Sequence, residues 1–233
     1  MTTPGVNYLD YALGVSSNFN DSAEGITITT LAKGGATPNE YLDMRITLSN
    51  PPASNALAYV SGTLAGAAGV AGNTNGAAGD ARFSSPTGVA VDDGGNVYVT
   101  EIDNLSIREI TSQGQVSTVA TGFVAPFNLA ADHATNLYVA DFGLRVIDKI
   151  SPGGTVTTLA GLASQVGTAD RTGSAARFTG SFGIATDDAG NVYVTDQVTV
   201  RKITPDGTVT TLAGAAGRSG SNDGSGTNAA FSN

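Results

Sequence analysis

The amino-acid sequence predicts an all-β protein, namely a β-propeller built from four-stranded antiparallel blades. Composition is the first observation, because 31 of the 233 residues are glycine and only 13% are charged, which suits many turns and short strands. The second observation is a sequence motif that recurs three times. The third is the content of each copy, in which four short apolar runs are separated by turn signals, a pattern typical of propeller blades.

The first copy shows the expected strands most clearly. Their centres lie at residues 89–91, 97–99, 107–110 and 116–119. These runs are apolar on both faces, as expected when each sheet packs between two neighbouring blades. The aligned copies predict blades at about residues 83–122, 123–161 and 178–214, and a loop to a next blade over 215–233.

A tight turn is expected between the first two strands of each copy. In the first copy, residues 92–96 read Asp-Asp-Gly-Gly-Asn. There Asp92 can accept hydrogen bonds from the turn amides, and glycine supplies a positive φ. Residues 187–191 repeat this chemistry. In the middle copy Thr135 takes the place of the glycine, so we expect that hairpin to be wider or strained.

The N-terminal region differs from the repeats. Residues 1–57 do not resemble a blade, and we expect a small β-rich appendage or linker there, with the propeller blades in 58–233. Two segments have the character of strands, 26–31 and 44–48. Residues 59–66 match the end of the third copy, so we expect the chain to enter the repeats on an outermost strand.

Long loops rich in Gly, Ala and Ser precede the first copy, precede the third copy and follow it. A polar residue lies at a common offset before an aligned phenylalanine in each loop: Asn75 before Phe83, Asp170 before Phe178 and Asp223 before Phe231. We interpret these polar residues as turn-capping side chains. Calcium binding is the alternative, although one carboxylate per loop falls short of the about six to eight oxygens that calcium takes.

These residues resemble the NHL-repeat family of β-propellers, of the kind found in large exported bacterial proteins. The resemblance covers residues 59–233 and is most specific at 86–100 and 183–214, which both contain Gly-Asn-Val-Tyr-Val. The Asn-His segment that the family has before the third strand is missing; the first copy has Asn104 and Leu105 there. Family members with lyase activity coordinate a metal through histidines of several blades, so none of those positions is carried over.

Charge and residue counts exclude several function classes. The net charge of −9 repels phosphate backbones, so we expect no nucleic-acid partner. The chain has no cysteine and one histidine, which excludes disulfides, thiolate zinc sites and a site of several histidines within one chain. No apolar run approaches the ~20 residues of a membrane helix, so no membrane insertion is expected.

The same composition bears on the cellular setting. Zero cysteine, three lysines and low overall charge, together with loops rich in Gly, Thr and Asn, resemble exported repeat proteins. We therefore expect an extracellular or cell-surface location. Residues 1–6 lack the basic and apolar parts of a signal peptide.

Few side chains are candidates for chemistry. His133 lies in the turn of the second hairpin and, without a partner, is expected to be structural or exposed. Asp141 and Asp196, with Glu101 at the same phase, follow the second strand of their copies. The family resemblance implies that these acids tie down the adjoining loop, and a polar ring at the mouth of the channel is the alternative.

A second set of polar residues lies on the third strand. Arg108, Asp148 and Arg201 share one position there, and we expect an inter-blade ion pair or a solvated edge. The glycine-rich loop 217–221 lacks the lysine and the strand-to-helix context of a phosphate-binding loop. Three serines lack a histidine or lysine base in motif spacing: Ser84, Ser85 and Ser181.

We therefore expect no catalytic, cofactor-binding or metal-binding residue. The favoured function is a noncatalytic binding or scaffolding propeller of an exported bacterial surface protein, which contacts protein or glycan through its inter-blade loops. The alternative is a propeller enzyme of the lyase or lactonase kind with a metal in the central channel. Equivalent positions of the innermost strands hold only alanine, Ala90, Ala130 and Ala185, which favours the noncatalytic function.

The number of blades predicts association. A propeller closes with about four to eight blades, so three blades form a partial ring with uncovered apolar faces, and such faces favour self-association. Two copies joined so that residues 59–66 of each complete a blade of the other would make a six-bladed ring. A chain cut from a longer protein and a cap formed by residues 1–57 are the alternatives.

Overall fold

The computed structural model describes residues 19–21, 26–34, 41–48 and 61–232. The chain divides into two compact units, residues 1–62 and residues 63–233. In the first unit, β1 (Phe19–Asp21), β2 (Ile26–Gly34) and β3 (Tyr41–Leu48) form an antiparallel sheet in the order β1-β2-β3. The expected β-rich appendage is therefore confirmed.

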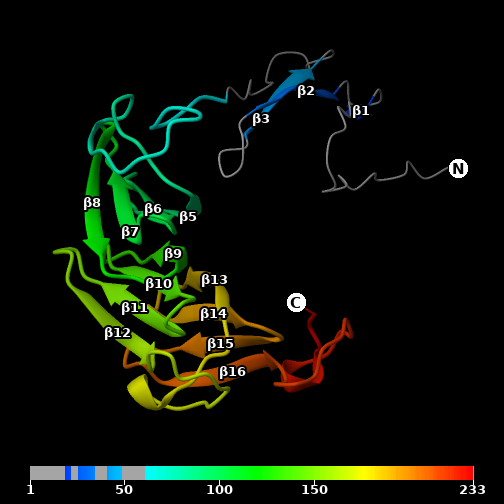
Figure 1. Ribbon diagram of the computed structural model, residues 1–233. Coiled ribbons are helices and arrows are strands. Elements are labelled where there is room, and N and C mark those ends of the chain that lie inside the picture. The colour runs from blue at the N-terminus through cyan, green and yellow to red at the C-terminus, as the bar shows by residue number, and fades with distance from the viewer. Residues whose placement is uncertain (1–18, 22–25, 35–40, 49–60, 233) are drawn as a thin grey trace, which may run out of the picture. The chain divides into compact units, whose positions relative to one another are not determined.

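The second unit consists of three antiparallel blades that follow one another along the chain (Figure 1). Blade 1 comprises β5 (Pro86–Val91), β6 (Val97–Glu101), β7 (Ser106–Ile110) and β8 (Gln115–Thr121). Blade 2 comprises β9 (Pro126–Ala131), β10 (Leu137–Asp141), β11 (Val146–Ile150) and β12 (Val156–Gly161). Blade 3 comprises β13 (Ser181–Thr186), β14 (Val192–Asp196), β15 (Thr199–Ile203) and β16 (Val209–Gly214). The predicted all-β fold with three four-stranded blades is confirmed.

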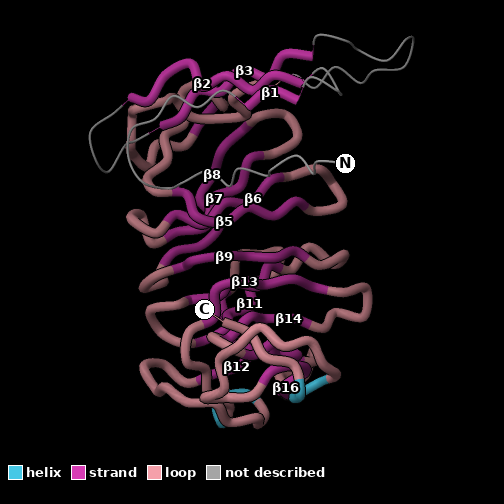
Figure 2. Tube along the Cα trace, turned by 90° about the vertical axis from the view of Figure 1, so that its right-hand side faces the viewer, coloured by secondary structure: helices cyan, strands magenta, loops and turns pink. Residues whose placement is uncertain are grey.

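Strands dominate the described part of the second unit (Figure 2). Helix is confined there to two 3₁₀ turns, η1 (Gly173–Ala175) and η2 (Gly226–Asn228). Among the described residues, no helix has the length and apolar character needed to cross a membrane. A two-residue strand, β4 (Gly76–Ala77), pairs with β8 and extends blade 1.

The expected outer strand at 59–66 differs from the structure. Residues 61–66 form no strand, and residues 59 and 60 lie outside the described residues. An outermost strand pairs with the third strand of its own blade, and the described residues before position 66 contain no third strand of a blade. Gly66 instead donates its backbone N–H to the carbonyl of Ala78 at 2.8 Å.

Apolar side chains between successive blades form the core. Ile107 of blade 1 packs with Leu129 and Val139 of blade 2, and all three are almost fully buried. Ile147 of blade 2 packs in the same way with Val192 of blade 3. Burying each such side chain contributes about 1.5–3 kcal/mol, so contacts between blades, rather than within one sheet, hold the second unit together.

Every blade carries the same irregularity between its third and outermost strands. The register shifts between Ile107 and Arg108, between Ile147 and Asp148, and between Val200 and Arg201. Such a bulge redirects the neighbouring side chain. It lies in each blade beside the third-strand position that holds Arg108, Asp148 or Arg201.

Candidate functional site

The first polar feature is the hairpin turn between the two inner strands of each blade. Asp92 accepts hydrogen bonds from the backbone and the side chain of Asn96, each at 2.9 Å, and from the hydroxyl of Tyr98 at 3.0 Å. Asp132 and Asp187 make the same contacts in the other blades. The predicted bonding of the aspartate back to its turn is confirmed, and these carboxylates serve the fold.

The middle turn is strained, as predicted. Thr135 adopts a φ of +59°, where the equivalent Gly95 and Gly190 have φ values of +77° and +75°. A β-branched residue in this left-handed region is a genuine outlier, because its Cβ approaches the backbone. The turn therefore keeps the hydrogen-bonding pattern of its neighbours at a conformational cost.

His133 joins the three turns. Its Nδ1 lies 2.7 Å from Oδ2 of Asp93, in the turn of blade 1, and its Nε2 lies 2.9 Å from Oδ1 of Asp188, in the turn of blade 3. The hydrogen bonds to Asp188 and then to Asp93 raise the pKa of His133 to about 9. The imidazolium thus bridges three blades at an exposed position, with a side-chain exposure of 63%.

The expectation that His133 is structural or exposed is confirmed. The expectation that it has no partner was wrong. The two carboxylates occupy the same turn position as His133 in the neighbouring copies. Aligning the turns would have shown the set, because equivalent turns of adjacent blades lie next to one another. Since both ring nitrogens face carboxylates, the imidazole is committed to ion pairing.

The acids that end the second strands are buried and bind the preceding connection. Glu101 accepts from the backbone N–H of Ser84 at 2.7 Å. Asp141 accepts from the backbone of Val124 and Ala125 at 2.8 and 3.0 Å. Asp196 accepts from the backbone of Thr179 and Gly180, both at 2.8 Å. The predicted loop-tying role is confirmed, and the alternative of a polar ring at a channel mouth is not what the contacts show.

Two arginines on the third strands complete these networks. Arg108 lies 3.1 Å from Glu101, and Arg201 lies 3.0 Å from Asp196, with both arginine side chains 1% exposed. The expected inter-blade pair or solvated edge was wrong, because each pair lies within one blade. The third strand is covered by the outermost strand on one side and the second strand on the other, so it offers no edge.

The arginines also bind the long loops that precede their blades. Nη2 of Arg108 donates to the side chain of Asn75 at 2.7 Å, and Nη2 of Arg201 donates to Asp170 at 2.6 Å. Asn75 and Asp170 are thus acceptors for an arginine of the following blade, not caps of their own turns. The interpretation as turn-capping residues was wrong, because an offset in sequence does not reveal a partner about 30 residues away.

Blade 2 lacks this arrangement. Asp148 takes the arginine position and accepts a hydrogen bond from Thr158 at 2.8 Å. Burial, together with the charge of Asp141, raises the pKa of Asp148 to about 6. The connection before this blade, residues 122–125, is short, so an arginine here would have no loop to hold.

The remaining candidates also have structural surroundings. The hydroxyls of Ser84 and Ser85 donate to Asp103, which holds them away from any role as nucleophiles with a histidine or lysine base. Ser181 lies on β13, and its side chain is outside the described residues. In the loop 217–221, Arg218 donates to the carbonyls of residues 227–229, so its guanidinium holds the loop itself.

The inner-strand alanines differ in their surroundings. Ala130 is 9% exposed, and Ala90 packs against the core between blades 1 and 2. Ala185, at the equivalent place in blade 3, is exposed. Among the described residues, no group of three or more His, Asp or Glu side chains has an arrangement that could hold a metal ion.

Comparison with known proteins agrees with this geometry. The class is that of β-propellers: the fold resembles an auxiliary nutrient binding protein from Bacteroides ovatus with a TM-score of 0.55 and 21% identity, over 65% of this chain and 42% of that chain. The model of the NHL repeat matches residues 83–109, which span β5, β6 and most of β7. The chain therefore has a β-propeller fold, and its residues 83–109 match the NHL repeat that the sequence resembles.

Two enzymes share weaker likeness. A gluconolactonase from Xanthomonas campestris aligns with a TM-score of 0.47 and 14% identity, over 59% of this chain and 50% of that chain. Virginiamycin B lyase from Staphylococcus aureus aligns with a TM-score of 0.45 and 16% identity, over 55% and 41%. The chain thus spans half or less of these proteins and of the binding protein. No curated protein matches the chain.

Proposed function

We propose that this chain is a noncatalytic binding or scaffolding module that contacts protein or glycan through its inter-blade loops. The observation that carries the proposal is that its repeated polar side chains are engaged in hydrogen bonds and ion pairs within the fold. Glu101, Asp141 and Asp196 hold loops, and His133 bridges three turns. These are the groups that acid-base or metal-assisted chemistry would need free.

Exposed apolar side chains on the connections between blades support a binding role. Val124 is 53% exposed, Leu162 is 41% exposed and Val166 is 64% exposed. Loops displayed by a rigid scaffold are common binding elements, and apolar side chains on them provide contact area that a partner can bury. Leu162 and Val166 lie on the same long loop before blade 3.

The test separates binding from catalysis on the purified chain. We expect saturable binding to a member of a glycan array or to a surface-protein panel, and loss of that binding in a Leu162→Ser, Val166→Ser double variant. Val156→Ser, at an exposed apolar position on β12, is the control and should bind normally. Turnover of an aldonolactone or a streptogramin B substrate, or tightly bound stoichiometric zinc or iron in elemental analysis, would establish the enzyme alternative instead.

We further propose that the module works outside the cell or on its surface. The absence of cysteine and the presence of only three lysines support this setting, as do the loops rich in Gly, Thr and Asn. Fractionation of the source cells with an antibody against this chain tests it. Recovery of the protein solely from the cytosol would overturn the proposal.

A further inference from the structure

Three long loops share one backbone design. We call them lead-in loops 1, 2 and 3, residues 67–83, 162–178 and 215–231. In each, a backbone N–H near the start donates to the carbonyl of the final phenylalanine: Gly72 to Phe83, Gly167 to Phe178 and Gly220 to Phe231, at 3.1–3.2 Å. A second N–H closes each loop across its middle: Arg82 to Thr74, Arg177 to Ala169 and Ala230 to Asn222, at 3.0–3.1 Å.

Lead-in loops 1 and 2 each receive an arginine from the third strand of the blade that follows. In loop 1, Arg108 donates to the carbonyls of Thr74 and Arg82, both at 2.9 Å. Its guanidinium also lies over the ring of Phe83, 4.9 Å from the centroid. The side chain of Asn75 completes the site. Lead-in loop 1 thus supplies two carbonyls, one side-chain oxygen and one aromatic face to the guanidinium, which also pairs with Glu101 of its own blade.

Loop 2 repeats these contacts around Arg201. The guanidinium donates to the carbonyls of Ala169 and Arg177 at 3.1 and 3.2 Å, and to Asp170 at 2.6 Å. It lies 5.1 Å from the ring centroid of Phe178. Because the same contacts recur in a second loop, the arrangement is a property of the repeat and is not particular to one blade.

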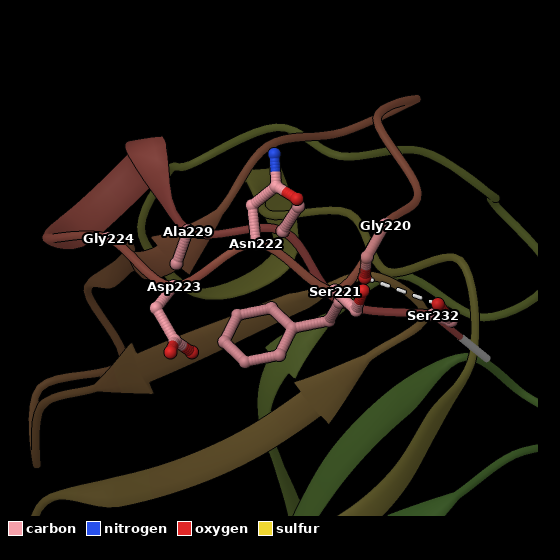
Figure 3. A pocket seen from close by; sticks show the side chains of 9 residues that line it. Gly220, Ser221, Asn222, Asp223, Gly224, Ala229 and Ser232 are labelled. Carbon is pink, nitrogen blue, oxygen red and sulfur yellow. Dashed lines mark hydrogen bonds between the residues drawn. The ribbon is translucent and has the colours of Figure 1, made fainter.

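Lead-in loop 3 presents the same groups. The carbonyls of Asn222 and Ala230, the carboxylate of Asp223 and the ring of Phe231 stand at the equivalent positions. They line a pocket of about 460 Å³ (Figure 3). No described residue donates a hydrogen bond to the Asp223 side chain, and no described arginine enters the pocket from a third strand.

Lead-in loop 3 holds its shape by contacts of its own. Nη2 of Arg218 donates to the carbonyls of residues 227–229 at 2.7–3.0 Å. In loops 1 and 2 the corresponding carbonyls bind Arg82 and Arg177, and Ala230 replaces those arginines here. The ring of Phe231 packs against Gly214 as the ring of Phe178 packs against Gly161. A Cβ added at these glycines would lie only 3.0 Å and 3.2 Å from the respective ring. The pocket is therefore formed before any ligand arrives.

We propose that the pocket of lead-in loop 3 binds the guanidinium group of an arginine on the third strand of a further NHL-type blade, which packs against blade 3. The planar fork of arginine matches two carbonyls and a carboxylate, and its face stacks on the phenylalanine. A lysine ammonium lacks that planar match. A calcium ion would find one carboxylate, too few oxygens for its usual coordination.

The face of blade 3 beside this pocket fits such a blade. We call it the trailing face; its apolar members are Ala185, Tyr193, Val200, Leu212 and Ala213. All the equivalent residues of blade 1, and all those of blade 2 except Ala130, belong to the core between that blade and the next. Leu212 is 50% exposed, and Val200 is partly buried where Ile107 and Ile147 are fully buried.

The occupant must bring an arginine that is not already held. In this chain Arg108 and Arg201 are both bound by their own lead-in loops, so blades 1 and 3 of a second copy do not offer one as they stand. The inference concerns blade packing and is independent of the ligand that the loops bind.

The experiment extends the full chain by one blade. A copy of residues 86–122 is fused after Asn233, so that lead-in loop 3 precedes it as lead-in loop 1 precedes blade 1. A double-mutant cycle then combines Asp223→Ala with Arg→Met at the grafted copy of Arg108, with unfolding by urea as the measurement. We expect a coupling of about tenfold in the unfolding equilibrium constant. Asp80→Ala, in lead-in loop 1, is the control and should show no coupling.

Additive effects of the two substitutions in a folded four-blade chain would overturn the proposal. If the graft does not fold, a second measurement decides on the unextended chain, namely NMR titration with N-acetyl-arginine N-methylamide. We expect saturable shifts at Asn222, Asp223 and Phe231 that the lysine analogue does not produce and that Asp223→Ala removes. Absence of these shifts, or their persistence in Asp223→Ala, rejects the site.

Discussion

Thr135 shows how one residue stores strain in an otherwise regular repeat. Its φ of +59° lies where the equivalent turns have glycine, and a non-glycine residue held there costs on the order of 1–3 kcal/mol. We expect Thr135→Gly to raise the free energy of unfolding by about 1 kcal/mol, because the strain is relieved. The gain is smaller than the strain itself, because glycine loses more backbone entropy on folding. Urea unfolding monitored by circular dichroism measures the change.

The matched control is Gly190→Thr, which introduces the same strain in blade 3, where glycine has a φ of +75°. This variant should lose stability by a similar amount. A destabilised Thr135→Gly variant would contradict the argument, because the turn would then depend on contacts of the threonine side chain more than on its backbone conformation.

Asp148 gives the protein a defined response to pH. Burial, with a contribution from Asp141, raises the pKa of Asp148 from 3.8 to about 6. A raised pKa means that the folded state binds the proton more tightly than the unfolded state does. The stability that this group contributes is therefore fully present below about pH 4 and is lost as the pH rises through about 6. The buried carboxylate therefore destabilises the fold at neutral pH.

Asp148→Asn removes that titration and keeps an oxygen that can accept from Thr158. We expect the variant to be more stable than the parent at pH 7, by on the order of 2 kcal/mol, and nearly equal to it at pH 4. Urea unfolding at both pH values measures the difference. A stability difference that does not change between these pH values would show that Asp148 does not titrate in this range.

At the scale of elements, local patterns predicted the strands and turns because each blade repeats its own hydrogen-bonding chemistry within about 40 residues. The arginine sites escaped prediction because their partners are far apart in the chain, as Arg201 and Asp170 are. The signal was nevertheless present: arginine occurs on the third strand only in the two blades that follow a long loop. The third-strand arginine and the long loop thus occur together in the same copies, and this joint occurrence indicates that they are in contact. It is seen only when the copies are compared with one another.

The Arg108 network links blade 1 to its lead-in loop and supports a prediction at this scale. Arg108→Met leaves Glu101 buried without its ion-pair partner and releases Asn75. Removing one member of a buried pair typically costs about 3–5 kcal/mol, and we expect a loss in this range by urea unfolding. Hydrogen exchange should also become faster in residues 67–82.

The control for this prediction is Arg82→Met in the same loop. Its guanidinium donates only to nearby carbonyls in a more exposed position, so we expect a loss of about 1 kcal/mol. If both variants lost equal stability, the buried pair would have no special weight, and the loop would be held mainly by its backbone hydrogen bonds.

At the scale of the whole molecule, repetition leaves two unlike faces. Each interior contact joins the trailing face of one blade to the leading face of the next, so the two faces are complementary but not identical. Val89, on the leading face of blade 1, is 65% exposed, whereas its equivalent Leu129 is 2% exposed. Complementary faces of this kind associate head to tail, which yields closed rings or open chains and not dimers in which the same face of each copy meets itself.

We therefore expect the chain to self-associate in a concentration-dependent manner through these faces, with a two-copy six-bladed ring among the products. The association should be weak, because a tight ring would require Arg108 of one copy to leave its own lead-in loop for that of the other. Light scattering across a concentration series measures it. Leu212→Asp places a charge on the trailing face and should shift the average mass towards the monomer. Gln113→Asp adds the same charge in the exposed turn after β7 and should leave the average mass unchanged. A parent chain that stays monomeric at every concentration would show that the exposed faces are too small to drive association by themselves.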